Sequence, residues 1–141
     1  MANIKQEIIV HGNAVQGGKD IEVVPQSDRA SITLKNNVRQ IQYPIPTPVI
    51  VNGQRLKAGK VWIRFSTHDS SDLEISFLKI MDGDKSHIAT INERLNGQQK
   101  QASYEFGHKE VAWGLNITIG VEYNTGPAVL DIHGIGIDFY V

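Results

Sequence analysis

Cysteine is absent from this chain, and so is any long apolar segment. The absence of cysteine excludes thiol catalysis, a disulfide scaffold and cysteine-ligated zinc. No apolar stretch approaches the roughly 20 residues that a membrane helix needs, so we expect no membrane insertion. The first residues, MANIKQEIIVHGN, lack a basic segment followed by a long apolar core. The default expectation is therefore a cytoplasmic protein, with signal-independent export as the alternative.

Net charge is almost absent as well. The chain carries 14 basic and 15 acidic residues, which gives a formal net charge of -1 at neutral pH. A chain with so little net charge has no long-range field that would attract nucleic acid, so we expect no nucleic-acid partner. The same near-neutrality removes repulsion between copies of the chain and favours a homo-oligomer.

Recognised catalytic motifs are also missing. The sequence has no Gly-x-Ser-x-Gly nucleophile elbow, and no glycine-rich phosphate loop precedes a helix pattern. We therefore expect that the protein is not an enzyme and has no cofactor. A hydrolase whose residues come together only on folding is the less favoured alternative.

Alternating strand patterns are what the sequence does contain. The clearest pattern places one apolar set on a single face: Trp113, Leu115, Ile117, Ile119, Val121 and Tyr123. A period of two predicts a half-buried strand with this set in the core. Further strands are expected at residues 6–10, 30–34, 38–43, 49–51, 61–67, 73–81, 86–91, 103–106 and 128–141. This spacing predicts an all-β fold with little or no helix, a single antiparallel β-sandwich domain over residues 1–141, either jelly-roll or immunoglobulin-like.

The last strand segment changes its phase part-way. Leu130 and Ile132 share one face, whereas Ile135, Ile137 and Phe139 occupy the alternate register. Glycines at positions 134 and 136 lie at this break. The pattern predicts a β-bulge that keeps both halves of the strand facing the core.

Three alternate prolines precede the middle of the chain, in the segment YPIPTPVIV at residues 43–51. Proline cannot donate a ladder hydrogen bond and holds the residue before it extended. Residues 44–48 are therefore interpreted as a stiff, unpaired step that carries the chain from one sheet to another. A proline-rich ligand for an aromatic groove is the alternative.

Several short segments resemble a family of small bacterial all-β domains of unknown function. They are HGNAV at residues 11–15, the IPTPVIV-like segment, MDGD at 81–84, WGLNITIGVEY at 113–123 and the ending IGIDFYV at 135–141. Residues 17–33 depart from the family pattern. The resemblance implies a β-sandwich and no particular activity.

Two aromatic residues are expected on the outer surface, each beside a charged residue. Trp62 lies next to Arg64 in one predicted strand, and Tyr140 lies next to Asp138 in the last strand. A flat ring flanked by polar groups can stack on a sugar or anchor a protein interface. These four residues are the candidate ligand-binding set.

Two loops are rich in carboxylates. The segments THDSSD and MDGDKS contain the candidate calcium ligands Asp69, Asp72, Asp82 and Asp84. Calcium binds six to eight oxygens, and adjacent loops could supply several of them; plain turns are the favoured interpretation, and a calcium site is the alternative. Neither loop follows the twelve-residue calcium-binding pattern, and Asp, Gly and Ser are also common turn formers.

The leading functional hypothesis is a non-catalytic β-sandwich that self-associates or binds a ligand through exposed strand faces. The candidate interface is the small polar face of residues 113–123, formed by Gly114, Asn116, Thr118 and Gly120. Glycines there would let another backbone approach closely. The alternative is a lectin-like carbohydrate-binding protein, with possible assistance from calcium.

Overall fold

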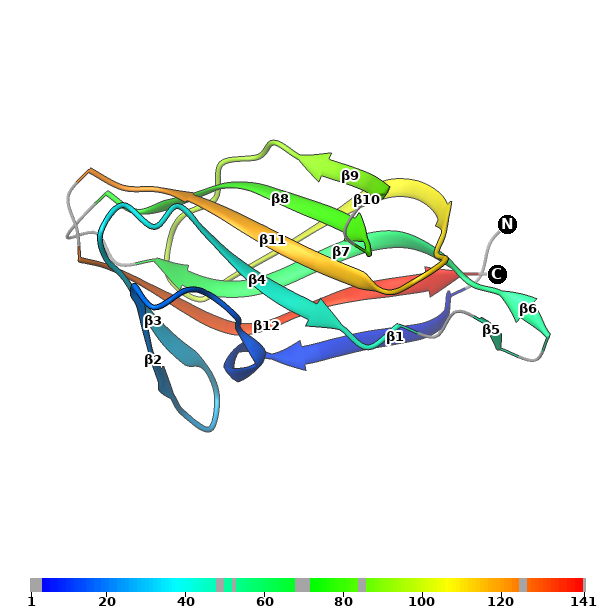
Figure 1. The fold of residues 1–141 in the computed structure, drawn as a ribbon, viewed down its shortest axis with the longest axis horizontal. Helices are drawn as coiled ribbons and strands as arrows, with labels where there is room; N and C mark the ends of the chain where they lie inside the picture. Colours follow the sequence, from blue (N-terminus) through cyan, green and yellow to red (C-terminus); the bar gives the residue numbers. More distant parts are fainter. Residues whose placement is uncertain are drawn as a thin grey trace.

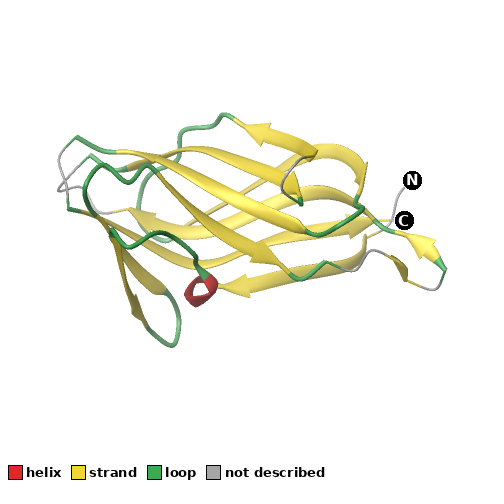
Figure 2. Ribbon diagram, viewed as in Figure 1, coloured by secondary structure: helices red, strands yellow, loops and turns green. Residues whose placement is uncertain are grey.

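The structure is a computed structural model, and it describes residues 4–47, 50–51, 53–67, 72–83, 86–124 and 127–140. Two antiparallel sheets face each other, and a short two-stranded hairpin extends from one end (Figure 1). Within the described ranges, the helical structure is limited to the 3-10 turn η1 (Gly12–Ala14), drawn in red in Figure 2. This architecture confirms the predicted antiparallel β-sandwich. No helix in the described ranges has the length and apolar character required to span a membrane.

The larger sheet has the strand order β10-β7-β12-β3-β2, and β1 also pairs with β12. Its strands are β1 (Ile4–His11), β2 (Ile21–Pro25), β3 (Ala30–Leu34), β7 (Lys57–Thr67), β10 (Lys100–Glu110) and β12 (Ala128–Tyr140). One edge of β12 is shared by two strands in succession, with β3 beside residues 128–132 and β1 beside residues 134–140. The other edge of β12 pairs with β7.

The smaller sheet has the order β4-β11-β8-β9 and covers the inner face of the larger one. Its strands are β4 (Gln40–Ile45), β8 (Glu74–Asp82), β9 (Ser86–Ile91) and β11 (Leu115–Glu122). The separate hairpin consists of β5 (Ile50–Val51) and β6 (Gln54–Arg55), at the right of Figure 1.

A β-bulge at His133 explains the phase change in β12. Ile132 pairs with Phe65 of β7 and Gly134 pairs with Arg64, so His133 is an extra residue on the β12 side. The apolar residues on both sides of the bulge are fully buried: Leu130, Ile132, Ile135, Ile137 and Phe139. The predicted bulge is therefore confirmed, and it keeps the core side chains of a 13-residue strand on one face.

The core face of β11 is confirmed except at its first predicted residue. Leu115 to Val121 bury their apolar side chains as expected, but Trp113 is 79% exposed. The prediction failed because the strand begins only at Leu115. Just before it, the buried carboxylate of Asp82 accepts the backbone N–H groups of Ala112, Trp113 and Gly114 at 2.7, 2.9 and 3.0 Å. These bonds take the place of hydrogen bonds to a neighbouring strand, so Trp113 lies in a turn before β11.

The strand β4 extends into the proline segment, so part of this segment pairs with β11. Pro44 pairs with Asn116 and Ile45 pairs with Leu115, so the expected unpaired run at 44–48 is wrong for its first two residues. Proline is tolerated there because β4 is an edge strand, where one side of the backbone needs no ladder partner. The chain then leaves the smaller sheet and enters the larger one at β7, as predicted. Residues 48 and 49 lie outside the described ranges.

Two glycines of β12 provide a matched test of this packing. A Cβ atom at Gly136 would lie 2.4 Å from the carbonyl oxygen of Ile8 and 3.1 Å from two ring carbons of Trp62. At Gly134 the nearest atoms would be 3.4 and 3.6 Å away, which is ordinary contact. We expect Gly136→Ala to lower the free energy of unfolding by about 1–3 kcal/mol and Gly134→Ala to change it by less than about 0.5 kcal/mol. Urea unfolding measures both, and equal losses would contradict the β1–β12 packing.

The hydrogen bonds of Asp82 predict how the free energy of unfolding depends on pH. Burial raises the pKa of Asp82, but the N–H groups of Ala112, Gly114 and Trp113 and the charge of Arg55 outweigh it and hold this pKa below its ordinary value. A carboxylate with a lowered pKa stabilises the fold at neutral pH, and the contribution is lost as the pH falls through the pKa of the folded protein. We expect Asp82→Asn to cost about 1.5–3 kcal/mol at pH 7 and to flatten the loss of stability in acid.

Urea unfolding of the parent and of Asp82→Asn at neutral and acid pH measures this effect. Equal stability of the two proteins at pH 7 would show that the carboxylate does not hold the Trp113 turn.

Candidate binding groove on the larger sheet

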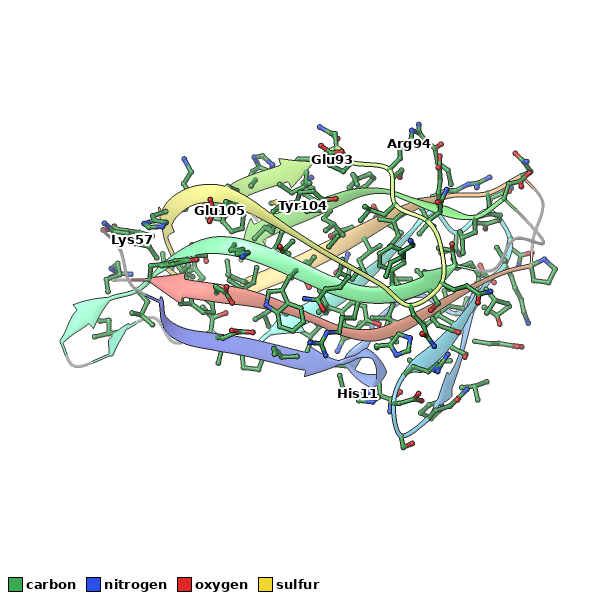
Figure 3. The ribbon with its side chains drawn as sticks, turned by 180° about the vertical axis from the view of Figure 1, so that it is seen from behind. His11, Lys57, Glu93, Arg94, Tyr104 and Glu105 are labelled. Atoms are coloured by element: carbon green, nitrogen blue, oxygen red, sulfur yellow. The ribbon has the colours of Figure 1, made fainter. Side chains whose placement is uncertain are left out.

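The outer face of the larger sheet carries a groove along the second half of β12. In Figure 3 the strands β1, β12, β7 and β10 lie side by side on the face toward the viewer. Gly136 lies between Ile9 of β1 and Trp62 of β7, and Gly134 lies two pairs further along, between His11 and Arg64. Gly134 has no side chain and lines the depression, whereas the Trp62 ring fills the space over Gly136. We call this depression the β12 groove.

The β12 groove has two halves that share their central residues. The first half has a volume of about 420 Å³ and reaches the turn between β2 and β3. The second half has a volume of about 270 Å³ and reaches toward Glu7 and Asp138. Both halves are lined by Trp62, Arg64 and Gln101, so one depression continues into the other.

Trp62 lies at the bottom of the groove rather than on its rim. The structure places it on the outer face beside Arg64, but its exposed fraction is only 5%. Its ring packs over Gly136, and the guanidinium carbon of Arg64 is 5.5 Å from the ring centroid. This arrangement is a cation–π contact that covers part of the ring. A ligand in the groove would therefore meet the ring edge and the Arg64 side chain before the ring face.

Buried polar atoms at the bottom of the groove have no hydrogen-bond partner among the described residues. The indole Nε1 of Trp62 is a donor, and Oδ1 of Asp138 is an acceptor. Both residues border the second half of the groove. Nε2 of His133, which borders the first half, has no partner either. Since buried polar groups are almost always paired in folded proteins, these three atoms are exceptions, and all three belong to residues that line the groove.

Tyr140 lies close to this set but is covered. Its ring stacks on His108 with 4.4 Å between centroids and 15° between planes. The pair packs over Gly59, where a Cβ atom would lie 2.7 Å from the Tyr140 ring. Burial raises the pKa of Tyr140, and the carboxylates of Asp138, Glu105 and Glu7 raise it further. The structure thus brings Tyr140 near Asp138 without exposing the ring expected for sugar stacking.

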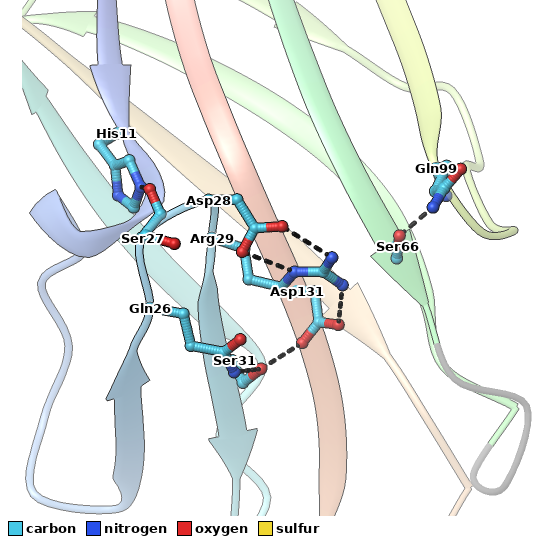
Figure 4. A network of polar contacts seen from close by, with 9 residues as sticks. All are labelled: His11, Gln26, Ser27, Asp28, Arg29, Ser31, Ser66, Gln99 and Asp131. Carbon is cyan, nitrogen blue, oxygen red and sulfur yellow. Dashed lines mark hydrogen bonds and ion pairs between the residues drawn. The ribbon is translucent and has the colours of Figure 1, made fainter.

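The other end of the groove contains an ion-pair network (Figure 4). Arg29 contacts Asp28 at 2.9 Å and Asp131 at 3.4 Å, and the hydroxyl of Ser31 donates to Asp131 at 2.7 Å. The hydrogen bond from Arg29 lowers the pKa of Asp28. Arg29 therefore neutralises the carboxylate that lines this half of the groove.

The candidate calcium ligands do not form one site in the described structure. Asp72 precedes β8 and Asp82 ends it, so the expectation that their two loops are adjacent is wrong. Asp72 accepts a hydrogen bond from Asn124 at 2.7 Å, and Asp82 holds the Trp113 turn. Asp69 and Asp84 lie outside the described residues. Among the residues that are described, no three His, Asp or Glu side chains are grouped so as to hold a metal ion.

The candidate interface on the smaller sheet is less bare than the sequence indicates. A Cβ atom at Gly120 would lie 2.0 Å from the ring of Phe77, so that ring already fills the space expected for another backbone. Thr118 is buried, whereas Gly114 and Asn116 are half-buried and Asn116 donates to Gln42 at 3.1 Å. The open strip of small residues is therefore interrupted by side chains from the neighbouring strands β4 and β8.

Sequence reasoning missed the residues that complete the groove. Glu7 comes from β1, Lys60 from β7, and Gln101 and Ser103 from β10, and these strands are far apart in the chain. Gly134 and Gly136 were the available signal, since glycine in a strand also marks a close approach of a ligand. Trp113 was assigned to the core, yet it is the most exposed of the large hydrophobic side chains that the structure describes.

The fold is similar to that of solved carbohydrate-binding modules. One is a low-affinity xylan-binding module, CBM86, from Roseburia intestinalis, with a TM-score of 0.61 and 12% identity, covering 95% of this chain and 96% of that one. Another is the CBM36-1 domain of a multidomain xylanase from the hindgut metagenome of Trinervitermes trinervoides, with a TM-score of 0.55 and 17% identity, covering 94% and 96%. A third is CsCBM6-3 from Clostridium stercorarium, solved with cellobiose, with a TM-score of 0.51 and 10% identity, covering 90% and 89%. At these identities the likeness establishes the shared β-sandwich.

No curated protein matches the sequence. The sequence resembles a family of unknown function, and this prediction is confirmed because such a family matches most of the chain. Residues 29–140 match the profile of a family of unknown function, DUF6623, and the chain belongs to that family.

Proposed function

We propose that this protein is a non-catalytic carbohydrate-binding module and that the β12 groove holds the sugar. The observation that carries the proposal is the pair of unpartnered atoms in the second half of the groove. One is the donor Nε1 of Trp62, and the other is the acceptor Oδ1 of Asp138. Both atoms belong to residues that line one depression, so a small shift of these side chains would let one ligand group serve both.

A sugar hydroxyl has this property, because it donates one hydrogen bond and accepts others. An apolar ligand would leave both protein atoms unpaired, whereas a hydroxyl that pairs with them recovers about 1–3 kcal/mol for each group. The polar side chains of Ser103, Gln101 and Lys60 line the same half and offer further bonds to hydroxyls. Carbohydrate chemistry therefore fits the groove better than apolar ligand chemistry.

The shape of the groove also supports a chain of sugar rings. It is open along β12, and its two halves continue past Trp62 on either side. Proteins of similar fold include a xylan-binding module and a module solved with cellobiose. These likenesses support a carbohydrate ligand for this chain, and the groove residues are the ones that we expect to bind it.

Removal of single polar atoms tests this function. Trp62→Phe keeps a ring but removes the donor, and Asp138→Asn replaces one acceptor oxygen by an amide. With xylan- and cellulose-derived oligosaccharides, we expect the parent to bind and each variant to bind about 3- to 30-fold more weakly, through loss of one hydrogen bond. Isothermal titration calorimetry measures the affinities, and urea unfolding checks that each variant folds.

Two further variants serve as controls. Gly134→Leu places a side chain on the groove floor and should abolish binding, whereas Trp113→Ala lies outside the groove and should leave it unchanged. Release of reducing ends during incubation would contradict the non-catalytic part of the proposal. Loss of binding in Trp113→Ala alone would place the site elsewhere.

Self-association is a second proposal, carried by the edge strand β2. Val23 and Val24 are 36% and 56% exposed, and within the described structure β2 pairs only with β3. An open edge with apolar side chains is a template for pairing with another chain. Light scattering from low to high micromolar concentration should show a mass above 15.6 kDa that Val24→Lys brings down. A mass of 15.6 kDa throughout would contradict it.

A further inference from the structure

The first half of the β12 groove is lined by more positive than negative side chains. Arg29, Arg64 and Lys100 border it, and Asp28 is the carboxylate that borders it. Arg29 is already paired with Asp28 at 2.9 Å and with the buried carboxylate of Asp131 at 3.4 Å, so it adds no free positive charge. The unpaired positive charge of this half therefore comes from Arg64 and Lys100.

Arg64 is placed to bind an anion. Its Nε donates to Oε1 of Gln101 at 3.1 Å, and its side chain is exposed above Trp62. Among the described residues, no carboxylate forms an ion pair with it. Its two terminal nitrogens make no hydrogen bond within the described part of the chain, and their planar fork matches a carboxylate in a bidentate arrangement. The bond to Gln101 and the contact with the Trp62 ring reduce the freedom of the side chain before a ligand arrives.

The opposite end of the groove has no such excess of positive charge. Glu7 and Asp138 border its second half together with Lys60 and Arg64, and Glu105 of β10 lies opposite Lys60 in the strand register. A negatively charged ligand group would therefore be attracted more strongly to the first half than to the second. The groove therefore distinguishes its two ends by charge as well as by the open hydrogen-bonding atoms.

We propose that the β12 groove selects a glycan that contains a uronic acid, with the carboxylate of that sugar bound by Arg64 and attracted by Lys100. Neutral rings of the same glycan lie over Trp62 and place hydroxyls against Asp138. The proposal rests on the carbohydrate-binding function of this groove and names the class of sugar that it prefers. A carboxylate on a side branch and a carboxylate on the main chain share this chemistry.

Matched ligands separate charge from shape. The probes are a neutral xylo-oligosaccharide, the same oligosaccharide with one glucuronic acid branch, and that branched form after reduction of its carboxyl group to an alcohol. A galacturonic acid oligomer and its reduced form test a carboxylate on the main chain. We expect a carboxylated form to bind about tenfold more tightly than its reduced form at low salt, with the preference shrinking as salt is added.

Substitutions of Arg64 assign the effect. Arg64→Gln should abolish the preference, and Arg64→Lys should keep part of it, because the charge remains and the fork is lost. Lys19→Gln removes the same charge from an exposed site outside the groove and should leave the preference intact. Urea unfolding confirms that each variant folds.

Each outcome has a distinct meaning. A preference for either carboxylated probe that depends on Arg64 supports the proposal and shows which source the groove takes. Equal binding of carboxylated and reduced forms overturns it and leaves carbohydrate binding in place. Failure of all five probes to bind overturns the carbohydrate-binding function together with it.

Discussion

The extra residue His133 in β12 determines how the larger sheet is built. β12 joins β7 on one edge to β3 and then β1 on the other, so it holds four strands of that sheet together. Without the bulge, a strict period of two would turn one half of its apolar residues outward. The same change of phase places Gly134, Gly136 and Asp138 in succession on the outer face. The bulge thus serves both the core and the β12 groove.

The groove leaves polar groups of the free protein unsatisfied. Trp62 and Asp138 are nearly fully buried, yet each contains an atom without a hydrogen-bond partner among the described residues. Such groups reduce the stability of the free protein, and a ligand that pairs with them gains this free energy on binding. Arg64 connects the two halves of the groove, because it contacts the Trp62 ring and borders both depressions. The unpartnered atoms of the second half and the positive charge of the first half therefore meet at the contact between Trp62 and Arg64.

Local patterns predicted the bulge and most strands, but they missed β2 (Ile21–Pro25) and most of β10 (Lys100–Glu110), whose positions depend on pairing with distant strands. The alternation around Ile117 and the phase change before Ile135 depend on neighbouring residues, and both were confirmed. Trp113 was wrongly placed because the turn that exposes it is held by Asp82, about thirty residues earlier. Pro44 was wrongly read as unpaired because an edge position becomes known only with the strand order. The groove itself required knowledge that β1, β7 and β10 lie beside β12, which no local pattern contains.

The two tryptophans allow the central claim to be tested directly, because each gives its own indole N–H signal in a ¹H–¹⁵N spectrum. Trp62 lies at the bottom of the groove with its N–H unpartnered, and Trp113 lies exposed on a turn outside it. During titration with an oligosaccharide that binds, we expect the Trp62 indole proton to shift downfield as it forms a hydrogen bond, with the Trp113 signal unchanged. A shift of the Trp113 signal with no change at Trp62 would contradict it.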